Sequence, residues 1–359
     1  MQTRPHVRAS RFPARHAGWA LASLVAVAAA SQASADDVAA FYAGKTVTFV
    51  SGSSPGGSYD VGSRLIARHL GKHIPGKPSV VVFNMPGAGS MTAANHLYSV
   101  ANKDGSVIGM FGRGLFLDAL FEAPGVRFDP RKFNWIGSHG REVSVLVAGI
   151  NTPFKTLADV QRAEMVVGAS PPGSDSHSFG VILNALLGTR LKIVSGYPGM
   201  AQAIMAIDRG EVEGNPGVSI GTLMALRPQW LKEPGHANFL VQLATEAHPT
   251  LLKGVPLAIE RARDEIDRQA LTLTLSRMTI AYAFTAPPDV PPDRVRALRA
   301  AFDAAVKDPA LIADAERMNA EIYPVTGDRV LAIIEQAYAS PKDVIARAKA
   351  AMLPPATPK

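Results

Sequence analysis

The 359-residue sequence contains no cysteine, which excludes disulfides, thiol catalysis and lipid attachment at a cysteine. Its net charge is +7. Four arginines and no acidic residue lie in residues 1–35, so the rest of the chain carries a net charge of only +3. No block of Lys and Arg with stacking aromatics follows, and we therefore expect no nucleic-acid partner.

Long apolar runs are also scarce. The run from Ala17 to Ala30 is shorter than the roughly 20 residues that a membrane-spanning helix needs. It follows the arginines and precedes Ala33-Ser34-Ala35, which is the order of a secretory signal, so we expect export with cleavage after Ala35. The chain is 47% hydrophobic, enough for a soluble protein with a sizeable core and about two domains.

Three segments share one plan, in which an apolar strand precedes a loop of glycine and small polar residues and then a helix. The strand at 46–50 leads into the loop Ser51–Asp60, SVVVF leads into Pro86–Ser90, and MVVGA at 165–169 leads into SPPGSDS. Glycine permits close backbone approach, and the unpaired N–H groups and dipole of a helix start favour an anion. Because these loops lack Lys and Arg, the sequence predicts a carboxylate or phosphate site made of backbone amides and serine hydroxyls.

The alternation of strands and helices predicts an α/β fold in which mostly parallel sheets carry helices on both faces. The pattern starts over near residue 140, and a strand at 279–286 leads back to helices at 292–307, 310–319, 328–338 and 341–352. These helices have no strands of their own, so we expect them to cover the first sheet. The expected organisation is a signal at 1–35, one domain of 36–139 with 278–359, a second of 140–277, and a ligand cleft between them.

Two catalytic patterns are weaker. Gly52-Ser53-Ser54-Pro55-Gly56 fits the nucleophile elbow of a hydrolase, but Pro55 has no N–H for an oxyanion hole. An exported hydrolase using Ser54 remains an alternative. His69 and His73 lie four residues apart on a predicted helix without the glutamate of a metalloprotease, so a solvated face is favoured over zinc.

Four polar residues near the loops have two interpretations each. Asp60 and Asp175 are either helix N-caps or pocket residues. His177 is either a core or capping residue or a donor to a ligand carboxylate, and Tyr197 is either an aromatic at the domain edge or a pocket hydroxyl.

The segments PGGSYD at 55–60, NMPGAGS at 84–90, GSDSH at 173–177 and GYPG at 196–199 resemble those of the Bug family, the substrate-binding proteins of tripartite tricarboxylate transporters. The resemblance covers the mature chain and extends to the KDG turn at 103–105 and DPAL at 308–311. It implies a type II periplasmic-binding-protein fold, or Venus flytrap, that captures small carboxylates and delivers them to a membrane permease. A sensor subunit with the same binding chemistry is a further alternative.

The sequence departs from the family pattern at four positions. Ser58 and Ser90 replace glycines, Met85 replaces an arginine, and Pro198 replaces a lysine. Because two of these changes remove basic residues near the expected cleft, we expect them to affect which ligand is bound rather than the fold.

The resemblance implies that backbone amides of the first two loops hold the ligand carboxylate and that the G-S-x-x-H loop closes over it. We expect a periplasmic monomer that is not an enzyme and has no cofactor, metal or catalytic residue. The expected ligand-binding residues are Ser53, Ser54, Gly56, Gly57, Ser58, Tyr59, Asp60, Pro86, Gly87, Ala88, Gly89, Ser90, Gly173, Ser174, Asp175, His177, Tyr197 and Gly199.

Overall fold

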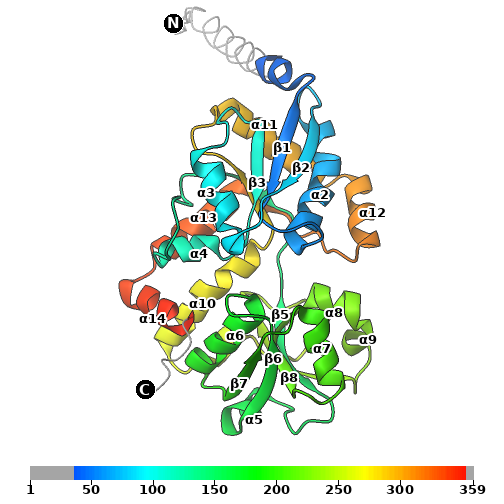
Figure 1. Cartoon of the computed structure of the whole chain (residues 1–359), viewed down its shortest axis with the longest axis vertical. Helices are drawn as coiled ribbons and strands as arrows, with labels where there is room; N and C mark the ends of the chain where they lie inside the picture. The colour runs from blue at the N-terminus through cyan, green and yellow to red at the C-terminus, as the bar shows by residue number, and fades with distance from the viewer. Residues whose placement is uncertain (1–35, 353–359) are drawn as a thin grey trace, which may run out of the picture.

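The computed structural model describes residues 36–352, which form two β-sheets with helices packed around each (Figure 1). The predicted signal segment and its cleavage site after Ala35 lie outside the described residues. After a short helix at 36–42, the chain builds most of the first sheet, crosses to the second, and returns.

The first sheet has six strands in the order β11-β4-β10-β3-β1-β2. The strands are β1 (Thr46–Ser51), β2 (Ser79–Asn84), β3 (Val107–Met110), β4 (Asn134–Ser138), β10 (Ala283–Ala286) and β11 (Val325–Thr326). β1 pairs in parallel with β2 and β3, whereas β10 runs antiparallel to β3 and β4. β10 starts at Ala283 rather than at 279, because Thr279 still belongs to the preceding helix.

The helices of the first sheet surround a core in which Phe49, Phe284 and Phe302 pack ring against ring at centroid distances of 5.4 and 5.2 Å. All three side chains are fully buried, and burial of aromatic area is a large source of stability. The elements around this sheet are α2 (Ser58–Leu70), η1 (Gly71–His73), η2 (Ala88–Ser90), α3 (Met91–Ser99), α4 (Leu115–Leu120), α11 (Pro292–Ala305), α12 (Pro309–Arg317) and α13 (Gly327–Tyr338).

The second sheet has five strands in the order β7-β6-β8-β5-β9. Its strands are β5 (Ser144–Gly149), β6 (Met165–Ala169), β7 (Leu191–Ser195), β8 (Gly214–Ser219) and β9 (Ala237–Leu243). Its helices are α5 (Leu157–Arg162), α6 (Asp175–Ile182), the π-helix η3 (Leu183–Leu187), α7 (Met200–Asp208), α8 (Ile220–Leu226), α9 (Pro228–Lys232), η4 (Ala258–Arg261) and α10 (Glu265–Thr279).

The predicted α/β class with two helix-flanked sheets is confirmed, but each sheet is mixed rather than mostly parallel. In the first sheet the antiparallel strand β10 enters from the crossing that follows α10. In the second, β5 runs antiparallel to both of its neighbours, because the chain enters this sheet directly from β4 without a crossover helix.

Two segments connect the sheets, residues 139–143 after β4 and residues 280–282 before β10. Each is bonded to the element that precedes the other: the Glu142 N–H donates to the carbonyl of Met278 in α10 at 2.9 Å, and the Tyr282 N–H donates to Oγ of Ser138 in β4 at 3.2 Å. We call these two segments the hinge.

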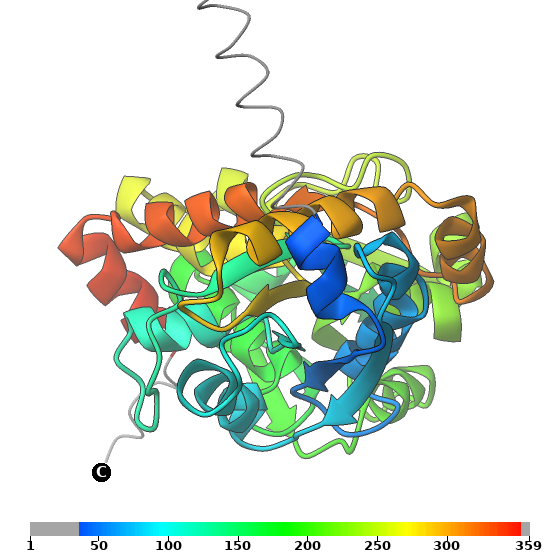
Figure 2. The ribbon, with the colours of Figure 1, turned by 90° about the horizontal axis from the view of Figure 1, so that it is seen from above.

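The C-terminal helices divide between the two halves. α11 and α13 pack on β4 and α12 packs on α2, as expected. The prediction is wrong for the last helix, α14 (Lys342–Met352), which packs on α10 and α6. Its apolar stripe, which includes Val344, Ala348 and Ala351, is buried there instead of on the first sheet. Figure 2 shows the orange and red C-terminal helices along one side of the molecule.

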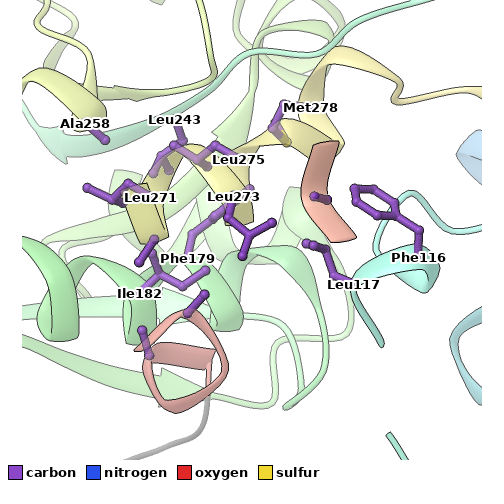
Figure 3. Packing of buried hydrophobic residues seen from close by; sticks show 14 of the residues in the cluster. Phe116, Leu117, Phe179, Ile182, Leu243, Ala258, Leu271, Leu273, Leu275 and Met278 are labelled. Atoms are coloured by element: carbon purple, nitrogen blue, oxygen red, sulfur yellow. The ribbon is translucent and has the colours of Figure 1, made fainter. Parts of the chain in front are cut away.

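One buried cluster joins the halves on this side. It contains Phe179 and Ile182 of α6, Leu271 of α10, and Phe116 and Leu117 of α4 (Figure 3). The halves therefore share a continuous apolar core around α10, and a cleft can open only elsewhere between them.

Candidate ligand-binding site

A cleft of about 580 Å³ lies between the two halves, on the side of α2 and α8. α2 lines it with Ser58, Val61 and Leu65, and hinge residues line its inner end. The opposite wall comes from the second sheet and its helices, and residues 318–321 complete the site. The lining residues of the opposite wall are Ser144, Asp175, Met200, Gly217, Ser219, Ile220, Gly221, Thr222, Met224, Ala225, Leu226 and His248.

The first glycine loop is fastened from within by Asp60, which is 2% exposed. The Gly56 N–H and Asn84 Nδ2 donate to its carboxylate at 2.8 Å, and the Asp60 N–H donates to Ser53 Oγ at 2.9 Å. Burial raises the pKa of Asp60, but hydrogen bonds from Arg64, the Gly56 N–H and Asn84 more than compensate and hold it below its usual value. The amide of Gly56, expected to bind a ligand, thus binds an internal carboxylate.

Asp60 matches neither of its two interpretations. The N-cap of α2 is Gly57, and Asp60 does not line the cleft. At the start of α2, the Asp60 N–H bonds to Ser53 Oγ and the Val61 N–H to the Gly57 carbonyl. The N–H groups of Ser58 and Tyr59 therefore remain as the donors that this helix start can offer a ligand in the cleft.

The second loop is tied to the first. Ser90 is buried, and its hydroxyl donates to the Gly52 carbonyl at 2.9 Å. Ala88 and Ser90 have φ values of 46° and 80°, a conformation that costs energy without glycine. The expected residues Pro86, Gly87, Ala88, Gly89 and Ser90 do not line the cleft, and all but Ser90 are exposed.

In the second sheet, Ser174 is the N-cap of α6, where its Oγ accepts from the His177 N–H at 3.4 Å. Asp175, the first residue of that helix, reaches the cleft. His177 lies in the first turn of α6, and Tyr197 and Gly199 lie in the loop before α7; none of the three lines the cleft. Of all the expected residues, the cleft therefore brings together Ser58, Tyr59 and Asp175.

A buried charged cluster lies at the inner end of the cleft, formed by Asp175 and three residues that were not predicted from the sequence, Arg113, Glu142 and Arg277. The Arg113 guanidinium bonds to both Glu142 and Asp175, and Arg277 Nη2 lies 3.5 Å from Asp175. The Arg113 and Arg277 side chains are 8% and 5% exposed, whereas Asp175 is 38% exposed. The cluster joins elements of both halves, since Arg113 follows β3 and Asp175 begins α6.

Charge and burial oppose each other in this cluster. Burial disfavours the charge of Arg113, yet the Asp175 carboxylate raises the pKa of Arg113 above its usual value. Burial likewise raises the pKa of Asp175, but Arg113 and Arg277 hold it below normal. Both groups are therefore charged at neutral pH. A sequence signal did exist: Arg113 stands between Gly112 and Gly114 just after a strand, at the sheet edge where open α/β folds bind ligands.

Aromatic rings connect the first loop to the hinge. Tyr59 packs on Tyr282 at a centroid distance of 6.0 Å, and Tyr282 stacks on His139 at 4.8 Å. The Arg113 N–H donates to the Tyr59 hydroxyl at 3.0 Å. Burial lowers the pKa of His139 to about 4, so the ring is neutral at pH 7, and its Nδ1 has no hydrogen-bond partner within residues 36–352.

The catalytic and metal patterns acquire no supporting geometry in the described part of the chain. Ser54 is exposed, and its hydroxyl bonds to no histidine there. His69 and His73 contact Asp314 and Asp308 near α12 at 2.7 and 2.9 Å, so the predicted solvated face is wrong, because α12 covers this face. No cluster suited to a metal ion is found within residues 36–352, and none of the helices described there could span a membrane.

No family model and no curated protein matches the sequence. Solved structures do, and their fold is that of two-domain periplasmic binding proteins, which confirms the predicted fold class. They include a TctC solute-binding protein from Polaromonas (TM-score 0.64, 20% identity, covering 83% of this chain and 96% of that one) and the periplasmic binding protein BugD (0.61, 20%, 86% and 98%). MatC from Rhodopseudomonas palustris with bound malate is also similar (0.58, 22%, 86% and 99%).

Within that class, the chain is thus similar in structure to TctC and Bug solute-binding proteins, which is the resemblance predicted from its motifs. The similarity spans nearly the whole length of each of these proteins. They are binding proteins rather than enzymes.

Proposed function

We propose that the protein is a periplasmic solute-binding receptor that captures a small carboxylate in the cleft and delivers it to a tripartite tricarboxylate-type membrane permease. The observation that carries the proposal is the cleft itself, which has a buried arginine and the first amides of α2 at its polar end. Its volume of about 580 Å³ lies within the range of roughly 300–1,000 Å³ typical of small-molecule sites. MatC, of similar fold, is described with bound malate.

Capture rather than catalysis fits the residues around the cleft. Ser54, the candidate nucleophile, does not line it, and Pro55 offers no N–H to an oxyanion. The charged and amide donors that do reach the cleft suit a carboxylate held without covalent chemistry. The expected absence of enzymatic activity is part of this proposal.

Closure of the cleft is the second part of the proposal. We assign residues 36–139 with 278–338 to one moving body, and residues 140–277 together with α14, which packs on α10 and α6, to the other, in a protein that works as a monomer. The hinge and the continuous core around α10 favour rotation that opens and closes the α2–α8 side. A ligand that contacts both walls would favour the closed arrangement.

Thermal denaturation of the purified protein with a panel of carboxylates tests the function. A carboxylate present at 100 times its dissociation constant should raise the unfolding free energy by about 2.7 kcal/mol. The panel should contain hexanoate, phenylacetate, malate and citrate, with hexanamide as the uncharged control. If no carboxylate raises the melting temperature more than hexanamide does, the proposed function is wrong.

A further inference from the structure

In the charged cluster at the polar end of the cleft, several hydrogen-bond donors have no acceptor among the described residues. Nε of Arg113 and both Nε and Nη2 of Arg277 have no hydrogen-bond partner within the described residues, although both side chains are more than nine-tenths buried. Buried donors in native proteins are nearly always bonded, so unpaired ones call for a physical reason. Here they indicate an arrangement that is completed by a rearrangement or by a ligand.

We propose that Arg113 binds the ligand carboxylate and that Asp175 occupies this position while the cleft is empty. Capture then exchanges one carboxylate for another on the same guanidinium. This inference rests on the proposed function and names the residue that selects the ligand.

Asp175 is the partner that can leave. Its side chain is 38% exposed, so its carboxylate can regain water, whereas that of Glu142 is 13% exposed. Glu142 is also fixed in the hinge by its N–H bond to the Met278 carbonyl. Glu142 therefore stays on Arg113 and maintains the guanidinium orientation during the exchange.

Arg277 is placed to receive Asp175. Its Nη2 lies 3.5 Å from Asp175 Oδ1, too far for a good hydrogen bond, and this nitrogen is one of the unpartnered donors. A small movement of Asp175 away from Arg113 would shorten this contact. The released carboxylate thus gains a full partner in Arg277, and Arg113 gains the ligand.

The rest of the cleft favours a ligand with a single carboxylate and an apolar body. Two arginines and three carboxylates line it. The second arginine, Arg141, pairs with Glu246 at 3.0 Å and lies over the ring of Tyr323. A second carboxylate on the ligand would find no free cation there. The remaining wall is largely apolar and includes Val61, Leu65, Ile220, Met224, Leu226 and Met318.

Calorimetric titration of hexanoate and phenylacetate into Asp175→Asn tests the exchange. The substitution preserves shape but removes the competing charge, so affinity for both carboxylates should rise about tenfold over wild type, while affinity for hexanamide should not. Asp208→Asn is a matched control, because Asp208 is 39% exposed, also pairs with an arginine, and lies away from the cleft. It should leave affinity unchanged.

Arg113→Lys provides the opposite change. It keeps the charge but loses the planar fork, and should weaken hexanoate binding at least tenfold in a protein whose melting curve stays cooperative. If this variant does not fold, Asp175→Asn alone decides. A crystal structure with hexanoate should show Asp175 bonded to Arg277 and the hexanoate carboxylate on Arg113.

Each other outcome has a definite meaning. Unchanged or weaker hexanoate and phenylacetate binding in Asp175→Asn would overturn the exchange, while the proposed function would stand on the wild-type binding. Tighter wild-type binding of malate or citrate than of hexanoate and phenylacetate would overturn the ligand class. Binding of no carboxylate to wild type or variant would overturn both the inference and the proposed function.

Discussion

Asp60 and Asp175 occupy equivalent places, each in the first turn of a helix that follows a strand and a glycine loop. Their side chains nevertheless bond to different parts of the molecule. Asp60 is 2% exposed and bonds only within its own half, to the Gly56 N–H, Asn84 and Arg64. Asp175 is 38% exposed and pairs with Arg113 across the interface between the halves. Asp60 therefore stabilises the conformation of its own loop, whereas Asp175 lines the cleft.

The difference comes from the neighbouring strand rather than from the loop. β2, beside the first loop, ends in Asn84, whose amide reaches Asp60. β7, beside the third loop, ends in Ser195, and the cations nearest to Asp175 belong to the segment after β3 and to α10. A similar local sequence therefore fixes its own loop in one half and faces the cleft in the other.

Substitution of the two aspartates by alanine gives the largest expected contrast. Asp60→Ala removes a buried acceptor of three side-chain or backbone donors and should lower the unfolding free energy by about 3 kcal/mol. Asp175→Ala should lower it by about 1 kcal/mol, because its carboxylate is partly solvated. Urea denaturation followed by circular dichroism measures both values. Equal losses of unfolding free energy in the two variants would mean that the two aspartates contribute equally to stability, contrary to this comparison.

Acidification tests the hinge, where His139 stacks on Tyr282 and Tyr282 packs on Tyr59 of the first loop. The pKa of His139 is about 4 in the folded protein and 6.5 when exposed. As pH falls from 6.5 to about 4, the unfolded chain binds a proton that the folded protein refuses, so stability is lost in this window. The loss approaches about 3 kcal/mol at pH 4 and vanishes above pH 6.5.

The measurement is the unfolding free energy of wild type and His139→Gln at a series of pH values. The variant should start lower at pH 7, because it loses the stacking on Tyr282, but its decline toward pH 4 should be shallower by about 3 kcal/mol. Parallel curves would mean that His139 accepts a proton inside the folded hinge.

The sequence predicted the strand–loop–helix units and the two helix-flanked sheets, because these follow from local periodicity and glycine placement. The strand at 165–169 and the helix at 328–338 lie within one residue of their predicted ends. The packing of α14 was not predictable, since its apolar stripe fits any complementary surface and α10, on which it packs, was not recognised as a helix.

The candidate site was predicted less well, for a physical reason. Anion binding by an amide depends on whether that amide is free, and the partner of the Gly56 N–H is a carboxylate four residues away, inside the same motif. Arg113 was missed because its importance depends on burial against Glu142 and Asp175, which are distant in sequence. Pairings of this kind exist only in the folded chain.

The smallest expected effects come from the loop backbones, which are alike in the two halves. Gly56 and Gly173 have φ values of 80° and 90°, and a Cβ at either position would meet no atom within 4 Å. Alanine at each position therefore suffers only from the left-handed conformation, and Gly56→Ala and Gly173→Ala should each lower the unfolding free energy by about 1 kcal/mol. Gly221→Ala is the control, because Gly221 lies in α8 without a positive φ and also faces open space, so alanine there should cause no loss of stability.

If Gly56→Ala and Gly173→Ala lose the same unfolding free energy, the two loops differ only in the bonding of their aspartates. A markedly larger loss in Gly56→Ala has one ready cause, since the Gly56 N–H is fixed on Asp60 and any shift of this residue breaks that bond. The double variant Gly56→Ala with Asp60→Ala separates the two cases. If the glycine effect disappears when Asp60 is absent, the loop backbone of the first half is held in place by its aspartate, and the third loop, whose aspartate faces the cleft, is free of that constraint.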